Sequence, residues 1–193
     1  MPARHGPAAA LLAASLAAPA LAQTPPAAPA PAAQTPPPAP PPVCTTPEHR
    51  QFDFWVGRWD VYPTGTDRLV AHSLIERLYD GCVIRENWMP LRGAGGGSLN
   101  SWIPAERRWR QVWADNRNAF HEYSGGMEDG AMILTASTTA RDGTPTLNRM
   151  RFTREPGGAV RQQGTVSTDG GRTWTAGYDF TYRPAREGGA AGE

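Results

Sequence analysis

The sequence predicts an all-β fold, an antiparallel up-and-down β-barrel of about eight to ten strands with a short N-terminal helix. From residue 55 to residue 183 the chain alternates apolar and polar residues in short segments that are broken by Gly, Pro, Asn and Asp. Closure is expected because an open sheet would leave its edge strands unpaired. Four turn-forming pairs support the hairpins between these segments: Asp80-Gly81, Asp129-Gly130, Asp142-Gly143 and Gly157-Gly158.

The chain divides into four expected parts. Residues 1–22 read as a signal peptide, because an apolar run from Ala8 to Leu21 ends in the small-x-small pattern Ala20-Leu21-Ala22. Cleavage after Ala22 and export to the periplasm or beyond are therefore expected. Residues 23–43 contain little besides Pro, Ala, Gln and Thr and are predicted to form a disordered tether. The barrel domain is assigned to residues 44–184, and residues 185–193 to a disordered tail.

The domain is expected to open with a short helix and to continue in strands. Thr46 is placed to cap the helix and Pro47 suits its first position. After Phe54 the period changes from helical to alternating. The predicted strands are 55–62, 69–79, 82–89, 97–103, 108–115, 119–125, 131–138, 147–154, 159–167 and 173–183.

One of the predicted turns carries a recognisable motif. Residues 167–174, STDGGRTW, fit the pattern S-x-D-x-G-x-T-W of the Asp-box. In that motif the Ser and Asp side chains bond to the turn backbone and the Trp packs beneath it. Sialidases carry several copies as hairpin locks away from the catalytic centre, so one copy predicts a stable hairpin and not glycosidase chemistry.

The chain has 2 cysteines, Cys44 and Cys82. An even count in an exported chain favours a disulfide between them. The sequence has no C-x-x-C motif and no His at metal-ligand spacing from either Cys, so neither a redox pair nor a metal site is predicted.

Charge and hydropathy exclude other classes of protein. Without Arg4 the mature chain has 18 arginines (19 − 1) against 18 acidic residues, which argues against binding to nucleic acid. No segment is long and apolar enough for a transmembrane helix. The oligomeric state is not predicted.

The aromatic order resembles that of a known group of proteins. The segments are FDFWVGRWDV, IE with GC one hairpin later, ENW, W-x-Q-x-W and DGGRTW. Together they resemble uncharacterised secreted bacterial proteins of the lipocalin-like kind, near domain of unknown function 1579, over about residues 48–183. The resemblance implies a calycin-type barrel in which Gly57-x-Trp59 begins the first strand and Trp55 and Trp59 plug one end. It supplies no catalytic residues. Nitrobindin-like haem barrels need a proximal His late in the chain, whereas the last His here is His121, so no cofactor is expected.

Alternation divides the strands into two faces and gives a candidate ligand site. If the faces that carry the large aromatics point inward, the interior combines apolar walls with a few polar groups, as a ligand cavity requires. Filling of the barrel by its tryptophans is the favoured alternative, and a one-residue slip in register would reverse every assignment. The candidate ligand-binding residues are Glu86, Trp88, Asn100, Trp102, Gln111, Trp113, His121, Tyr123, Arg149 and Arg151.

Three functions remain open from the sequence. The leading interpretation is an exported barrel that binds a small hydrophobic or amphipathic compound, its head group oriented by polar residues of the candidate site. The second is a cavity enzyme of isomerase or cyclase type, in which His121 and Glu86 exchange protons as weak catalytic candidates. The third is a solid-core structural or interaction module.

Overall fold

The computed structural model describes residues 43–140 and 142–185. The predicted signal peptide, nearly all of the predicted tether and nearly all of the predicted tail lie outside these residues. No helix among the described residues is long and apolar enough to cross a membrane.

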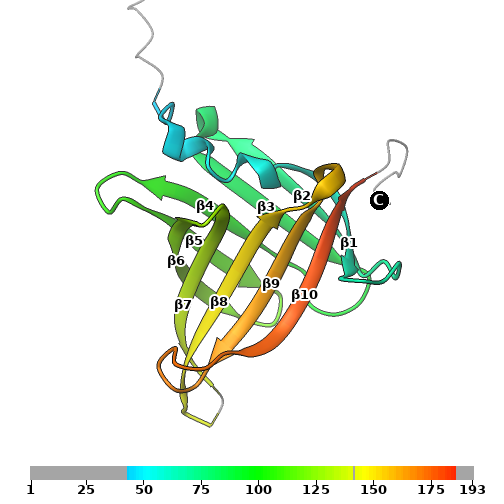
Figure 1. Cartoon of the computed structure of the whole chain (residues 1–193), viewed down its shortest axis with the longest axis vertical. Helices are drawn as coiled ribbons and strands as arrows, with labels where there is room; N and C mark the ends of the chain where they lie inside the picture. Colours follow the sequence, from blue (N-terminus) through cyan, green and yellow to red (C-terminus); the bar gives the residue numbers. More distant parts are fainter. Residues whose placement is uncertain (1–42, 141, 186–193) are drawn as a thin grey trace, which may run out of the picture. The chain divides into compact units, whose positions relative to one another are not determined.

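The described chain forms a closed barrel of ten antiparallel strands, as predicted (Figure 1). Each strand pairs with its neighbours in sequence, and the first and last strands close the barrel, with Trp59 opposite Pro184. The predicted strands all exist, with ends that differ by up to three residues. They are β1 (Gly57–Pro63), β2 (Ala71–Leu78), β3 (Val83–Pro90), β4 (Gly96–Ile103), β5 (Arg108–Asp115), β6 (Phe120–Glu128), β7 (Ala131–Thr139), β8 (Pro145–Arg154), β9 (Val160–Ser167) and β10 (Thr175–Pro184).

The two ends of the barrel differ. The closed end, where β1 begins and β10 finishes, carries four 3-10 turns, and Ala185 leaves β10 there with its N–H donating to the carbonyl of Arg58 (2.9 Å). The open end carries the loops between β1 and β2, β3 and β4, β5 and β6, β7 and β8, and β9 and β10. The turns are η1 (Pro47–Arg50), η2 (Asp53–Trp55), η3 (Tyr79–Gly81) and η4 (Pro156–Gly158).

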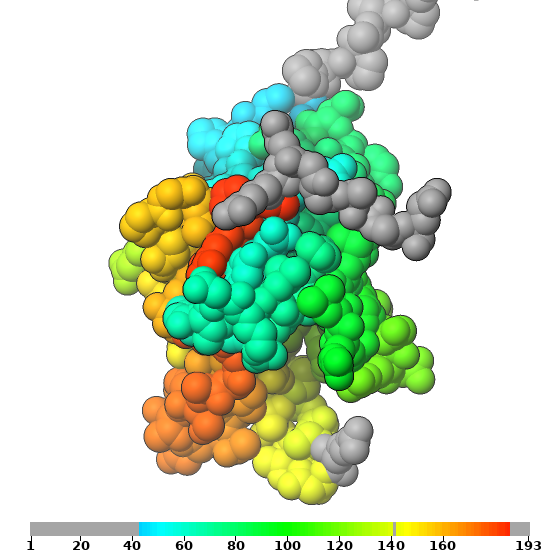
Figure 2. All heavy atoms as spheres, turned by 90° about the vertical axis from the view of Figure 1, so that its right-hand side faces the viewer, coloured from blue at the N-terminus to red at the C-terminus, as the bar shows by residue number. Residues whose placement is uncertain are grey.

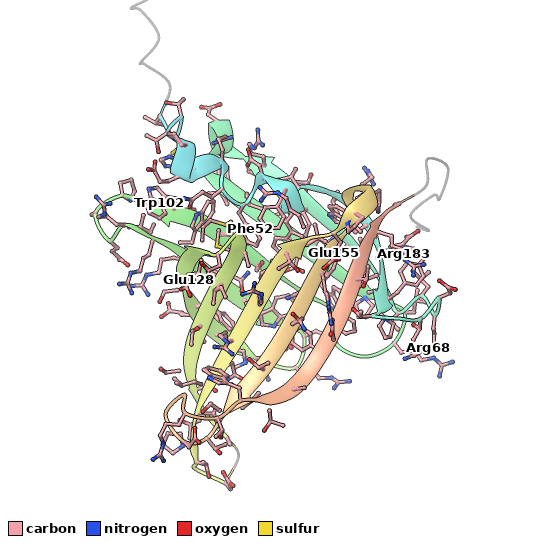
Figure 3. All side chains as sticks on the ribbon, viewed as in Figure 1. Phe52, Arg68, Trp102, Glu128, Glu155 and Arg183 are labelled. Carbon is pink, nitrogen blue, oxygen red and sulfur yellow. A yellow bond between two sulfur atoms is a disulfide. The ribbon has the colours of Figure 1, made fainter. Side chains whose placement is uncertain are left out.

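An aromatic plug fills the closed end beneath η1 and η2 (Figure 3). Phe52 and Trp55 are fully buried and stack with ring centroids 4.9 Å apart. Phe152 of β8 packs against Trp55 at the same centroid distance, 4.9 Å. The indole N–H of Trp59 donates to the carbonyl of Trp55 (2.9 Å), which ties the start of β1 to the plug. The sequence assigned Trp55 and Trp59 to this end, and both lie there.

The opening helix differs from its prediction in detail. Residues 47–50 form a single 3-10 turn, with Pro47 at its start as expected. Thr46 does not cap the free amides of this turn. Its hydroxyl donates to the carboxylate of Glu48 (2.6 Å) and contacts Nδ1 of His49 (3.0 Å). The Thr46 side chain is turned toward these two side chains and away from the backbone N–H groups that a cap would accept.

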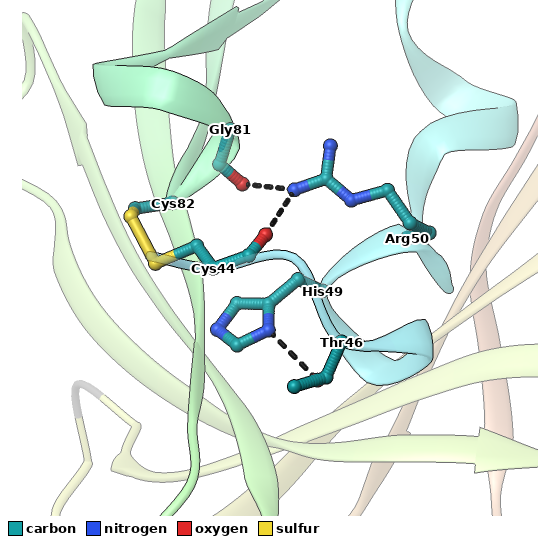
Figure 4. The surroundings of a disulfide bond; sticks show 6 residues. All are labelled: Cys44, Thr46, His49, Arg50, Gly81 and Cys82. Atoms are coloured by element: carbon teal, nitrogen blue, oxygen red, sulfur yellow. Dashed lines mark hydrogen bonds between the residues drawn. A yellow bond between two sulfur atoms is a disulfide. The ribbon is translucent and has the colours of Figure 1, made fainter. Parts of the chain in front are cut away.

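Cys44 and Cys82 form the predicted disulfide, which fastens the start of the domain to the hairpin between β2 and β3 (Figure 4). Arg50 reinforces this link, because its Nη2 donates both to the carbonyl of Cys44 (2.8 Å) and to that of Gly81 (2.7 Å). The backbone at Gly81 has a φ of +89°, so the turn favours glycine there, and a Cβ would also displace the Arg50 guanidinium. The disulfide is compatible with an extracellular or periplasmic location.

Loss of the disulfide is expected to be costly. The bond spans a sequence separation of 38 residues. Replacing both cysteines by serine should therefore lower the free energy of unfolding by about 3–4 kcal/mol, through the added entropy of the unfolded chain. Urea unfolding of the variant and of the oxidised protein measures this difference. Reduction of the native protein should give a similar loss, and equal stability of all three samples would contradict the assignment.

The Asp-box closes the loop between β9 and β10 at the open end, as predicted. The hydroxyl of Ser167 accepts the N–H of Gly171 (2.9 Å), and a carboxylate oxygen of Asp169 accepts the N–H of Thr173 (2.9 Å). Hydrogen bonds from the hydroxyl and N–H of Thr173 lower the pKa of Asp169 to about 2. The indole N–H of Trp174 donates to the carbonyl of Gly171 (3.0 Å). The motif is a hairpin lock in this structure.

Candidate functional site

A cavity of about 270 Å³ lies inside the barrel between the aromatic plug and the open end. In liquid water, about nine water molecules take up this volume. Figure 2 shows the surface hollowed between the teal and green segments above and the orange and yellow segments below. Four aromatic side chains form much of the cavity wall: Trp88, Trp113, Tyr178 and Phe180.

Glu86 supplies the acidic group of the cavity from the middle of β3. Its side chain is only 6 % exposed, because alternation along β3 turns it inward between Ile84 and Trp88. The hydroxyl of Ser98 donates to Oε2 of Glu86 (2.9 Å), while Oε1 has no hydrogen-bond partner among the described residues. Burial raises the pKa of Glu86 to about 7, and the hydrogen bond from Ser98 opposes this rise.

A chain of donors leads to Glu86 across three neighbouring strands. Nε2 of Gln111 on β5 donates to Oδ1 of Asn100 (2.7 Å). Nδ2 of Asn100 on β4 donates to the hydroxyl of Ser98 (3.1 Å) and to the carbonyl of Ile84 (3.0 Å). Because Ser98 then donates to Glu86, every bond of this chain points toward the carboxyl group. This series of hydrogen bonds favours the ionised form of the carboxyl group, which only accepts hydrogen bonds.

A second polar group lies on β9 and β10. The hydroxyl of Tyr182 donates to Oε1 of Gln162 (2.6 Å), and Nε2 of Gln162 donates to the hydroxyl of Tyr178 (3.2 Å). Gly164 makes room for this arrangement, because a Cβ there would lie 2.2 Å from a ring carbon of Tyr178. The Tyr178 ring stacks on Phe180 with centroids 5.3 Å apart. Burial raises the pKa of Tyr182, so its hydroxyl stays protonated.

The structure brings most of the sequence-predicted site residues together. Asn100 is fully buried but lies behind the cavity wall, within the donor chain. Trp102 packs against the core nearer the closed end (Figure 3). Six of the ten candidates line the cavity: Glu86, Trp88, Gln111, Trp113, His121 and Tyr123.

The prediction that Arg149 and Arg151 share the interior with Glu86 is wrong. Met150 lines the cavity and Phe152 is fully buried, so alternation along β8 places both arginines on the outer face. Arg149 lies over the Trp174 ring there, with its guanidinium carbon 3.9 Å from the ring centroid. Burial of two apolar side chains decided the register, and the Asp-box provides an aromatic partner for an outward arginine.

Sequence reasoning missed several residues of the cavity. Tyr178, Phe180 and Tyr182 recur at every second position of β10, which is the signal of an inward-facing aromatic row. Met150 alternates with Phe152 on β8, and choosing this apolar pair as the inner face would have found it. Gln162 also lines the cavity, and alternation along β9 places it on the same face as the buried Val160.

His121 and Glu86 face the same cavity without touching. No hydrogen bond or ion pair joins them among the residues that the structure describes, although both line the cavity. The ring of His121 instead lies edge-on to Tyr123, with centroids 6.3 Å apart. A general acid or base acts within hydrogen-bond distance, or through one water, of the proton that it transfers, so these two groups could act together only on a molecule bound between them. The arrangement therefore presents two separate titratable groups.

Residues 43–140 and 142–185 contain no group of three or more His, Cys, Asp or Glu side chains that could hold a metal ion.

No protein-family model and no curated protein matches this chain.

Proposed function

We propose that this protein is an exported barrel that binds a small, largely apolar molecule in the cavity behind its open end. The observation that carries the proposal is the cavity itself: about 270 Å³, walled by aromatic rings and reached by a few polar groups from opposite sides of the barrel. Its volume is close to the lower limit of about 300 Å³ for small-molecule sites. The cavity also argues against a solid core. Kinship with the lipocalin-like proteins near domain of unknown function 1579 is part of the proposal.

A matched pair of glycine substitutions tests binding. Gly164→Ala places a methyl group against the Tyr178 ring and should push that ring from the cavity wall. Gly126→Ala is the control, because a Cβ there meets no atom within 4 Å on strand β6. With phenethyl alcohol as the probe, we expect binding to the native protein and to Gly126→Ala. Binding to Gly164→Ala should be at least about tenfold weaker.

Nuclear magnetic resonance of the indole N–H groups gives the readout. The resonances of Trp88 and Trp113 should shift on titration because both rings line the cavity. The resonance of Trp174 should stay fixed because its N–H bonds to Gly171 outside the cavity. No shift at any tryptophan at millimolar probe, or equal shifts in both glycine variants, would contradict binding at this site.

Proton-transfer catalysis is a second candidate function, and one observation favours it. The pKa of Glu86, about 7, suits a general acid or base near neutral pH. Glu86 would be the group that transfers the proton, with His121 on another part of the cavity wall. Hydrogen–deuterium exchange at the α-carbon of a small cyclic ketone tests this function. Exchange that the native protein accelerates and Glu86→Gln does not would support it, and equal rates would exclude it for that probe.

A further inference from the structure

The cavity combines an acidic group with free acceptor atoms and aromatic rings. Of the residues described as lining it, none is an arginine, since Arg149 and Arg151 lie on the outer face, and the chain contains no lysine. Glu86 is the acidic residue among them. A carboxylate ligand would therefore meet a buried carboxyl group without a cationic partner, which disfavours acidic compounds.

Two oxygen atoms at the cavity wall near Glu86 lack a hydrogen-bond donor. Among the described residues, Oε1 of Glu86 and Oε1 of Gln111 have no hydrogen-bond donor, whereas Nε2 of Gln111 donates one N–H to Asn100. The donor chain from Gln111 through Asn100 and Ser98 holds both groups in this orientation. A ligand that satisfies the two oxygens must bring N–H or O–H groups of its own.

The walls suit a positive charge as well as an apolar body. Trp88 and Phe180 lie with ring centroids 5.8 Å apart, and Tyr178 stacks on Phe180 at 5.3 Å. Aromatic faces attract ammonium groups, most strongly where water is excluded. The buried carboxyl group would also gain an ion partner, which compensates the cost of ionising it in an apolar site.

We propose that the ligand is an organic cation, a primary amine on a small aromatic or aliphatic body, whose ammonium group binds Glu86 and Gln111 while its body packs among Trp88, Tyr178 and Phe180. This inference rests on the proposed binding function and specifies its ligand class. Of the polar residues expected from the sequence to orient a head group, Glu86 and Gln111 line the cavity and the two arginines do not.

The pH dependence of binding follows from the groups that face the cavity. Glu86 ionises near pH 7 in the empty protein, whereas an alkyl ammonium group keeps its proton to well above pH 8. Affinity for an amine should therefore rise from pH 5.5 to pH 8. The tyrosine hydroxyls stay neutral over this range, since burial raises their pKa values. The other titratable side chains lining the cavity are His121, Tyr123, Tyr178 and Tyr182.

Three probes of one shape test the proposal by calorimetry with the native protein: phenethylamine, phenethyl alcohol and 3-phenylpropionate. At pH 8 we expect the amine to bind at least about tenfold more tightly than the alcohol, and the acid to bind most weakly. Glu86→Gln should remove the advantage of the amine, measured as the ratio of amine to alcohol affinity in the same variant. Glu122→Gln, an exposed position on β6, is the matched control and should leave all three affinities unchanged.

The outcomes separate the two proposals. Equal binding of alcohol and amine, tighter binding of the acid, or an unchanged amine affinity in Glu86→Gln would overturn the cation inference and leave the binding function intact. Absence of binding by all three probes at millimolar concentration would contradict the binding function and the cation inference together. Circular dichroism and unfolding of Glu86→Gln verify that the variant is folded when it is titrated.

Discussion

Replacing Trp55 by alanine is expected to lower the free energy of unfolding by about 3–5 kcal/mol. Trp55 is fully buried at the centre of the plug and contacts Phe52, Phe152 and Tyr182. Its removal leaves a cavity among rings that the barrel strands hold in place, so collapse around the smaller side chain is limited. Chemical unfolding followed by circular dichroism measures the loss.

Trp55→Phe provides the control for this prediction. The indole N–H of Trp55 has no hydrogen-bond partner among the described residues. Replacing Trp55 by phenylalanine therefore reduces the ring volume but breaks no side-chain hydrogen bond. We expect a loss well below that of alanine, because most of the aromatic contact is kept. A loss below about 1 kcal/mol for Trp55→Ala would show that the closed end does not depend on the plug.

Glu86 is expected to make the protein less stable as the pH rises from 4.5 to 7. The unfolded chain releases the proton of this carboxyl group near pH 4.5, whereas the folded protein keeps it to about pH 7. Between these values the folded state binds more protons, so the free energy of unfolding falls with pH, by about 3 kcal/mol in total. Below pH 4.5 and above pH 7 this contribution is constant.

Glu86→Gln isolates that contribution. Glutamine does not titrate, and its carbonyl oxygen can still accept the hydroxyl of Ser98. Urea unfolding of both proteins from pH 4 to pH 8 gives the difference in stability at each pH, in which the other titrating groups cancel. The free energy of unfolding of the variant, relative to that of the native protein, should increase as the pH rises. A difference that does not change with pH would show that Glu86 ionises normally.

Sequence periodicity predicted the barrel well because its signal is repeated along the chain. Each of the ten strands alternates, and several of the turns that separate them carry Gly where the backbone has positive φ, as at Gly130 and Gly157. The disulfide followed from the presence of 2 cysteines, and the Asp-box from its side-chain pattern. Such features depend on local chemistry, which the sequence contains directly.

The candidate site was predicted less completely because inward orientation depends on packing across the barrel. On β3, β4, β5 and β6 a large aromatic residue or a core apolar residue marked the inner face correctly. On β8 the choice lay between Leu147, Arg149 and Arg151 on one face and Met150 and Phe152 on the other. Burial of Met150 and Phe152 decided it, and the contacts of Phe152 with Phe52 and Trp55 join segments that are distant in sequence. Cavity volume is likewise set by how all ten strands pack, and no single segment reveals it.

Both ends of the described chain lie at the plugged end of the barrel, near Cys44 and Ala185. A fluorescent label, a fusion partner or a solid support joined at either point would therefore stand on the far side from the cavity mouth. Under the binding function proposed above, immobilised protein should keep the affinity of the free protein for phenethyl alcohol, since the cavity opens in the opposite direction. The same geometry makes the five loops of the open end the natural region for changing ligand selectivity by sequence diversification, because they are distant from the plug and the disulfide that hold the fold.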